Sequence, residues 1–150
     1  MSQPRLLLAD DHAQTAELLR GLLEPEFDVI AQVQDGLALV NAAERLSPDV
    51  IVSDISMPGL DGISAAHAIL GKNPAARIVF VTVHCDSILA QRGFETGALG
   101  YVVKSAAGDE LVAAVRSALR GERHVSPAAL RPERHISRAA LQSVGMTSTR

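Results

Sequence analysis

The chain alternates short apolar runs with segments of helical periodicity, and this alternation is the feature that most constrains its fold. The apolar runs cover Arg5–Ala9, Phe27–Val33, Val50–Asp54, Arg77–Thr82 and Leu99–Val103. The helical segments lie at Ala16–Leu23, Leu37–Leu46, Ile63–Leu70, Ser87–Glu95 and Leu111–Leu119. Runs that are almost continuously apolar are typical of strands buried on both faces, and crossovers of helical length impose parallel pairing. The pattern predicts an α/β fold: a doubly wound parallel sheet of five strands, built from five βα units.

Polar side chains stand where four of these runs end. Asp10 and Asp11 follow the first run, Asp54 ends the third, Thr82 ends the fourth and Lys104 follows the fifth. Because the carboxyl ends of parallel strands meet at one edge of a sheet, we expect these side chains to converge there. Three clustered carboxylates repel one another and require a cation, and Mg²⁺ prefers oxygen ligands. A hydroxyl and an ammonium group beside them suit a dianion, so the arrangement predicts a Mg²⁺-dependent phosphoryl site built on an aspartate.

Over residues 5–121 the chain resembles the receiver domain of bacterial two-component response regulators. The resemblance is carried by the aspartate pair, by the sequence DISMPGLDG that begins at Asp54, and by Thr82 and Lys104. The sequence GALGYVVK at residues 97–104, with the helix after it, is similar to receivers of LuxR/FixJ-like (NarL-type) transcription regulators. This implies a flavodoxin-like, CheY-like fold. It also implies a signalling domain that catalyses only its own phosphorylation and dephosphorylation and is not otherwise an enzyme.

The resemblance also implies roles for the acidic residues. Asp54 would be the phosphoacceptor, and a carboxylate is a competent nucleophile toward phosphorus. Asp11 would bind Mg²⁺ directly, and Asp10 would bind it directly or through a water. The backbone carbonyl of Ser56 would complete the protein ligands, since Mg²⁺ keeps several waters.

Three further residues take roles from the same resemblance. Lys104 would pair with a phosphoryl oxygen, and Thr82 would donate its hydroxyl to the phosphoryl group. Tyr101, the only tyrosine of the chain, would be a switch residue that turns inward when Thr82 moves.

Three departures from the pattern of many receivers involve four residues. Ser105 stands where proline often follows the lysine, and a cis bond between Lys104 and Ser105 would cost about 3–4 kcal/mol, so trans and strained cis geometries are both open. Val83 is bulkier than the residue frequent at its position. Ser56 and His84 flank the route of an attacking water.

Charge divides the chain into an acidic body and a basic tail. Residues 1–122 carry nine basic and sixteen acidic side chains, whereas residues 123–150 carry five arginines and one glutamate. We therefore predict a receiver domain over residues 1–124 and a basic tail or linker over residues 125–150, with the composition changing near Ser126–Pro127. From Pro127 onward we expect one loosely docked helix or no fixed structure. The tail is too short for a complete helix-turn-helix domain.

The predicted function is that of a receiver that accepts a phosphoryl group from a sensor histidine kinase and then changes its binding partner. One possible partner is a second copy of the chain, bound through the last helix with Ala113, Ala114, Arg116 and Ser117 facing outward. DNA would be a partner only through an output domain in a longer protein. Alternatives are the receiver part of a truncated DNA-binding transcription regulator, a small Mg²⁺-dependent phosphatase or phosphotransferase, and a binding module that keeps the fold only. A single cysteine and no long apolar segment favour the cytoplasm.

Overall fold

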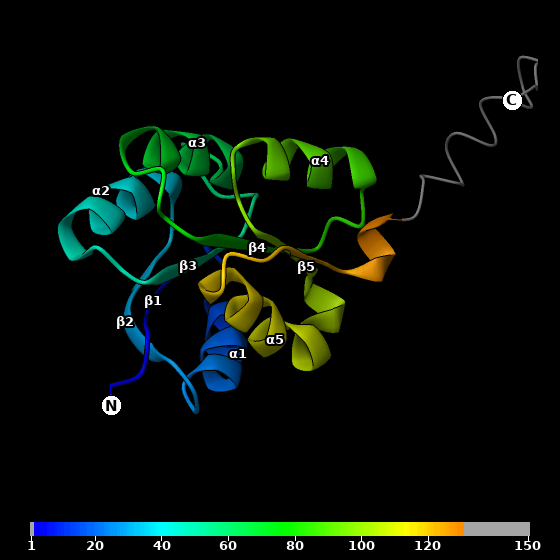
Figure 1. Cartoon of the computed structure of the whole chain (residues 1–150), viewed down its shortest axis with the longest axis horizontal. Helices are drawn as coiled ribbons and strands as arrows, with labels where there is room; N and C mark the ends of the chain where they lie inside the picture. Colours follow the sequence, from blue (N-terminus) through cyan, green and yellow to red (C-terminus); the bar gives the residue numbers. More distant parts are fainter. Residues whose placement is uncertain (1, 131–150) are drawn as a thin grey trace, which may run out of the picture.

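The computed structural model describes residues 2–130 as one parallel sheet between two layers of helices (Figure 1). The strands are β1 Arg5–Ala9, β2 Asp28–Val33, β3 Val50–Ser53, β4 Ile78–Thr82, β5 Gly100–Val103 and β6 His124–Val125. The helices are α1 Ala13–Leu23, α2 Gly36–Leu46, α3 Gly62–Lys72, α4 Ser87–Glu95 and α5 Ala107–Leu119, with 3-10 turns at Lys104–Ala106 and Pro127–Leu130. The strand order is β2-β1-β3-β4-β5-β6. The predicted doubly wound α/β fold is confirmed.

The two faces of the sheet bury separate apolar clusters. Helices α2, α3 and α4 cover one face, while α1 and α5 cover the other (Figure 1). Along β1, Leu7 packs toward the first layer and Leu6 and Leu8 pack toward the second. This alternation follows from the period of two of a strand. Leu6, Leu7 and Leu8 are all fully buried, so both faces of β1 are apolar and the strand forms a continuous apolar run in the sequence.

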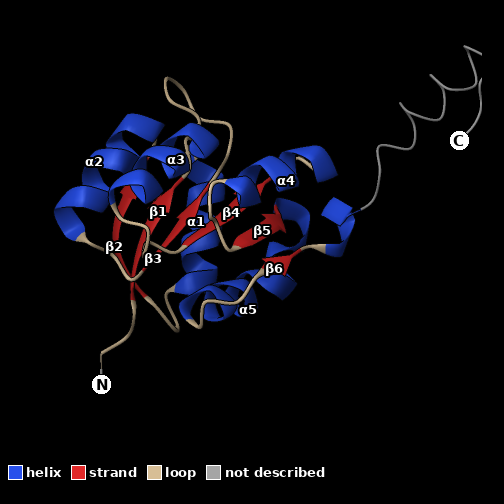
Figure 2. Ribbon diagram, turned by 45° about the horizontal axis from the view of Figure 1, so that its top comes forward, coloured by secondary structure: helices blue, strands red, loops and turns tan. Residues whose placement is uncertain are grey.

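The sheet has a sixth strand where five were predicted. β6 lies beside β5 (Figure 2). The two strands pair in parallel, with His124 opposite Gly100 and Val125 opposite Tyr101. The turn at Pro127–Leu130 then packs against the sheet, and Ala129 is fully buried. The ordered fold therefore continues past residue 124 to Leu130, and the expectation of one loosely docked helix or no fixed structure from Pro127 onward remains a prediction. A strand of two residues carries too short a pattern to be read from sequence; the rest of the tail lies outside the described residues.

Helix ends follow the sequence signals closely. Asp35, Asp61 and Asp86 each accept a backbone hydrogen bond as the N-cap of α2, α3 and α4. Ser47 ends α2 with a φ of 45°, directly before Pro48, as expected because proline disfavours a preceding helical residue. These helix starts place the loops after β2, β3 and β4 along one edge of the sheet.

One expectation for α5 is wrong. Ala113 and Arg116 are exposed and Ser117 is half-buried, but Ala114 is fully buried against the sheet. Ala114 lies on the same buried face of α5 as Leu111 and Ala118. Because alanine is small and occurs on both faces of helices, its residue type did not indicate that it faces the sheet.

Candidate functional site

Three aspartates converge at the carboxyl edge of the sheet, as predicted. Backbone hydrogen bonds extend the strand ladders into the site, from Asp10 N–H to Val33 O at 3.0 Å and from Asp54 N–H to Ala9 O at 2.9 Å. One ligand atom from each of Asp10, Asp11, His12 and Asp54 lies within 4.8 Å of the others. Asp10 and Asp54 are 1% and 4% exposed. The sheet thus holds carboxylates together that electrostatics alone would separate.

Lys104 joins two of these carboxylates. Its Nζ lies 2.9 Å from Asp54 Oδ2 and 2.9 Å from Asp10 Oδ2. Burial opposes the charge of the ammonium group, but its contacts with the carboxylates of Asp10 and Asp54 outweigh it and raise the pKa of Lys104 above its ordinary value. The side chain therefore stays charged and supplies one of the cations that the acidic cluster needs.

The remaining carboxylate oxygens fit a hard divalent cation. Asp11 Oδ1 and Asp10 Oδ2 are buried atoms that accept no hydrogen bond of good geometry, although Lys104 Nζ lies close to the second. A single ammonium group does not compensate three carboxylates. Anionic oxygens from several residues within reach of one point are the donor set that Mg²⁺ requires.

The loop after Asp54 is held tightly against it. Asp54 Oδ1 accepts a hydrogen bond from Ile55 N–H at 2.7 Å, and Gly62 N–H donates to Ile55 O at 2.7 Å. A Cβ on Gly62 would lie 2.1 Å from the Asp54 carbonyl oxygen. Only glycine therefore permits α3 to begin so close to the candidate phosphoacceptor.

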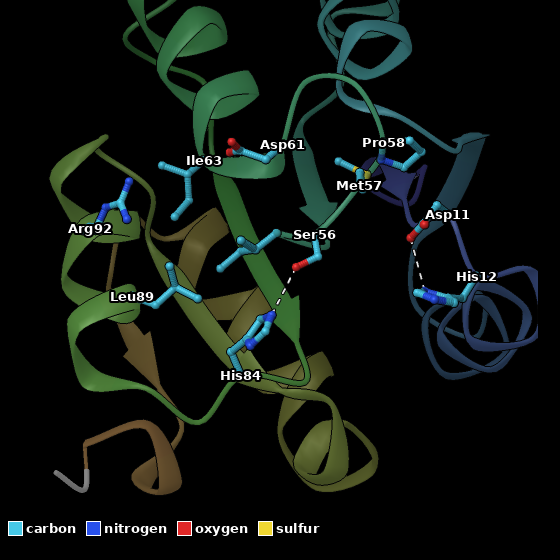
Figure 3. Close-up of a pocket in the computed structure, with 11 residues that line it drawn as sticks. Asp11, His12, Ser56, Met57, Pro58, Asp61, Ile63, His84, Leu89 and Arg92 are labelled. Atoms are coloured by element: carbon cyan, nitrogen blue, oxygen red, sulfur yellow. Dashed lines mark hydrogen bonds and ion pairs between the residues drawn. The ribbon is translucent and has the colours of Figure 1, made fainter. Parts of the chain in front are cut away.

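A cavity of about 720 Å³ opens beside the cluster, and Asp11, Ser56 and Asp61 line it (Figure 3). Ser56 Oγ and His84 Nε2 lie 3.1 Å apart in a hydrogen bond that links the β3–α3 and β4–α4 loops. The sequence placed both residues beside the route of water without predicting that they touch.

Thr82 and Tyr101 are both fully buried. Thr82 Oγ1 accepts a hydrogen bond from His84 N–H at 3.3 Å. The Tyr101 side chain points inward, and its hydroxyl donates to the His84 carbonyl at 2.9 Å. Both predicted switch residues therefore contact the same short segment of the β4–α4 loop.

The structure also describes the two other departures from the receiver pattern, Ser105 and Val83. No peptide bond within residues 2–130 is cis, so Lys104–Ser105 is trans and leads directly into the 3-10 turn. The Val83 side chain is 65% exposed.

Two features of the structure were not predicted from sequence. His12 Nδ1 lies 3.1 Å from Asp11 Oδ1, at the mouth of the acidic cluster. Glu110 Oε1 accepts a hydrogen bond from Ser126 Oγ at 2.7 Å and lies 2.9 Å from His124 Nε2, which ties β6 to α5. The position of His12 next to the aspartate pair could have indicated its contact with Asp11. The Glu110 contacts could not be predicted, because they depend on the unpredicted strand β6.

Comparisons with known proteins agree on one family. A family model described as the response regulator receiver domain matches residues 6–116. The transcriptional regulatory protein DegU of Brevibacillus brevis is 32% identical over 125 residues, covering 82% of this chain and 53% of the relative. LiaR of Bacillus subtilis is 38% identical over 120 residues, covering 79% and 57%. The chain thus spans a little over half the length of these relatives.

Solved structures give the same result. A LuxR-family two-component response regulator from Aurantimonas sp. SI85-9A1 is 35% identical, with a TM-score of 0.80, and the match covers 97% of this chain and all of that one. The receiver domain of a NarL-type regulator from Mycobacterium tuberculosis is 26% identical, with a TM-score of 0.77, over 81% of this chain and all of that one. Among the described residues no helix is long and apolar enough to span a membrane.

Proposed function

This chain belongs to the response regulator receiver domain family, and from that premise we propose that Asp54 is its phosphoacceptor. The observation that carries the proposal is the position of Lys104 Nζ, 2.9 Å from Asp54 Oδ2 and from Asp10 Oδ2 at the carboxyl end of β3. Asp54 also belongs to the acidic cluster, and the residues that directly follow it, Ile55 and Ser56, line the adjoining cavity. The product is a signalling state of the domain, not a released metabolite.

The reaction transfers one phosphoryl group. An Asp54 carboxylate oxygen attacks phosphorus and forms the acyl phosphate bond, while the bond from phosphorus to its donor breaks and the donor keeps that electron pair. A bound Mg²⁺ would neutralise charge on the phosphoryl oxygens, held by Asp10, Asp11, Asp54 and the Ser56 carbonyl. Lys104 turns from Asp10 and Asp54 to a phosphoryl oxygen, and the Thr82 hydroxyl becomes a donor to another.

The partners follow from the same chemistry. The phosphohistidine of a sensor histidine kinase is the proposed donor, and acetyl phosphate is a small-molecule substitute. Phosphorylation then favours a homodimer through α5 or a different protein partner, in the cytoplasm. The name of DegU as a transcriptional regulatory protein favours a second candidate, in which the receiver controls a DNA-binding output within a longer protein.

Intact-mass measurement tests the assignment. Acetyl phosphate with Mg²⁺ should add one phosphoryl group to the wild type and none to Asp54→Asn. Asp61→Asn is the matched control, because Asp61 lines the same cavity and caps α3, and asparagine caps a helix as well as aspartate does. Full labelling of Asp54→Asn would overturn the assignment, and loss of labelling in both variants would show that the whole loop is needed.

A further inference from the structure

The acidic cluster contains one nitrogen donor that the proposed Mg²⁺ site does not use. His12 directly follows the aspartate pair in the sequence and is the N-cap residue of α1, but its side chain makes no capping hydrogen bond. Its ring instead lies against the carboxylate of Asp11 (Figure 3), and its Nδ1 is 3.5 Å from Asp10 Oδ1. The imidazole therefore stands among the candidate metal ligands and not over the helix end.

The contact between His12 and Asp11 has the spacing of two ligands and not the geometry of a hydrogen bond. His12 Nδ1 lies 3.1 Å from Asp11 Oδ1, yet that buried oxygen accepts no hydrogen bond of good geometry. In an octahedral complex with bonds of about 2.1 Å, adjacent ligand atoms lie about 3.0 Å apart. The pair therefore already has the separation of neighbouring ligands around one ion.

A second observation also points to a cation. Asp10 is 1% exposed, and its Oδ2 likewise accepts no hydrogen bond of good geometry, with only the Lys104 ammonium nearby. Ligand atoms of Asp10, Asp11, His12 and Asp54 all lie within 4.8 Å of one another, close to the roughly 4.0–4.6 Å that separates opposite ligands of one ion with bonds of about 2.0–2.3 Å. A buried carboxylate that is incompletely compensated favours a charged ligand over water.

We propose that His12 is a nitrogen ligand that lets this site bind a first-row transition metal more tightly than Mg²⁺. The inference rests on the proposed metal site and specifies which cations that site accepts. Carboxylate oxygens alone suit Mg²⁺ and Mn²⁺, whereas imidazole adds affinity for softer divalent ions such as Co²⁺. The receiver would then respond to the transition-metal content of the cell as well as to its kinase.

Pulsed electron paramagnetic resonance tests the nitrogen ligand directly. Mn²⁺ bound to the tag-free protein should show the modulation of a coordinated imidazole nitrogen. The signal should vanish in His12→Ala and persist in His84→Ala, whose ring lines the same cavity, and in His67→Ala, on the exposed side of α3. A signal lost in His84→Ala and kept in His12→Ala would overturn the assignment, as would bound Mn²⁺ without nitrogen coupling.

Calorimetric titration measures the preference. The ratio of Co²⁺ to Mg²⁺ affinity should exceed one in the wild type, fall about tenfold in His12→Ala and stay unchanged in His67→Ala. An equal ratio in wild type and His12→Ala would reduce His12 to an ion-pair partner of Asp11 and overturn the inference alone. If neither metal binds the wild type, the proposed metal site itself fails. Asp11→Asn should weaken both metals.

Discussion

The hydroxyl of Tyr101 donates a hydrogen bond to the backbone carbonyl of His84 at 2.9 Å, and this contact fixes the β4–α4 loop to β5. Since Thr82 lies two residues before His84 and contacts its N–H, one short segment joins the two predicted switch residues. Any movement of Thr82 toward a phosphoryl group would change the surroundings of the Tyr101 ring.

Tyr101 should resist ionisation until the chain unfolds. Burial raises its pKa above the ordinary 10.0, and the acidic groups of Asp86, Cys85 and Asp54 add to the effect. The folded state therefore favours the protonated phenol, so this stability is complete below pH 10 and is lost as the pH rises further. Because the chain has one tyrosine and no tryptophan, phenolate absorbance near 295 nm reports Tyr101 alone. Absorbance that rises near pH 10 with an unchanged circular dichroism spectrum would contradict this prediction.

Replacing Lys104 should make the fold depend on a divalent cation. Lys104→Met leaves the carboxylates of Asp10 and Asp54 without their ammonium partner, which should lower the free energy of unfolding by about 3 kcal/mol in metal-free buffer. Mg²⁺ should restore more stability to this variant than it adds to the wild type, because the ammonium and the ion neutralise the same carboxylates. Urea unfolding with chelator and with Mg²⁺ measures both effects.

The matched control for Lys104 is Lys72→Met. Lys72 Nζ lies 3.6 Å from Glu44 in an exposed ion pair, and such pairs contribute about 0–1 kcal/mol. Equal Mg²⁺ stabilisation of Lys104→Met and the wild type would refute the prediction that lysine and metal act on the same charges.

The contacts of Glu110 with His124 and Ser126 should make the packing of β6 against α5 sensitive to acid. Burial opposes the charge of this carboxylate, but hydrogen bonds from Ser126 and His124 outweigh it and lower the pKa of Glu110. The stabilisation is therefore complete above the ordinary value of 4.5 and is lost as the pH falls below it. Glu110→Gln should cost about 1–2 kcal/mol at neutral pH, and its difference from the wild type should narrow in acid. Glu122→Gln, which breaks an exposed pair with Arg120, should show little change at either pH.

The segment from β6 to Leu130 should contribute measurably to folding. A chain ending at Arg123 loses the buried Ala129, the ladder bonds of β6 and the hydrogen bond from Val103 N–H to Ser126 Oγ. Relative to a chain ending at Leu130, its free energy of unfolding should fall by about 2–4 kcal/mol. Identical urea midpoints for the two chains would show that the segment only rests on the domain.

Substitutions on α5 should separate association from folding. Ala113 is exposed and Ala114 is fully buried. With beryllofluoride as a substitute for the phosphoryl group, sedimentation should shift toward dimer in the wild type and less so in Ala113→Glu. Ala114→Glu should instead lower the unfolding midpoint, because it buries an unpaired charge. A monomeric activated wild type at high micromolar concentration would exclude self-association through α5.

The sequence predicted what depends on period and on strand ends. The strands β1, β3, β4 and β5 were readable because both of their faces are buried, and the half-buried edge strand β2 still has an apolar run. Asp10, Asp54 and Lys104 were placed together because parallel strands end at one edge. The contacts that join loops were not readable. His84 contacts Ser56 and Tyr101 only because two βα crossovers bring their loops and strand together. Nothing in the sequence around any of these residues indicates its partner. The direction of Ala114 was missed because alanine occurs on both faces of a helix.

The short β6 strand has a consequence for what can attach to this sheet. An exposed strand presents free N–H and C=O groups that a strand from another molecule can pair with. On one side β6 pairs with Gly100 and Tyr101 of β5, and Val103 N–H donates to Ser126 Oγ, so within residues 2–130 this border offers only a short template for strand addition. The six-residue β2 is the other border. Among the described residues, β2 is therefore the longer border on which a foreign strand could extend this sheet, and it lies away from Tyr101 and the face that would respond to phosphorylation.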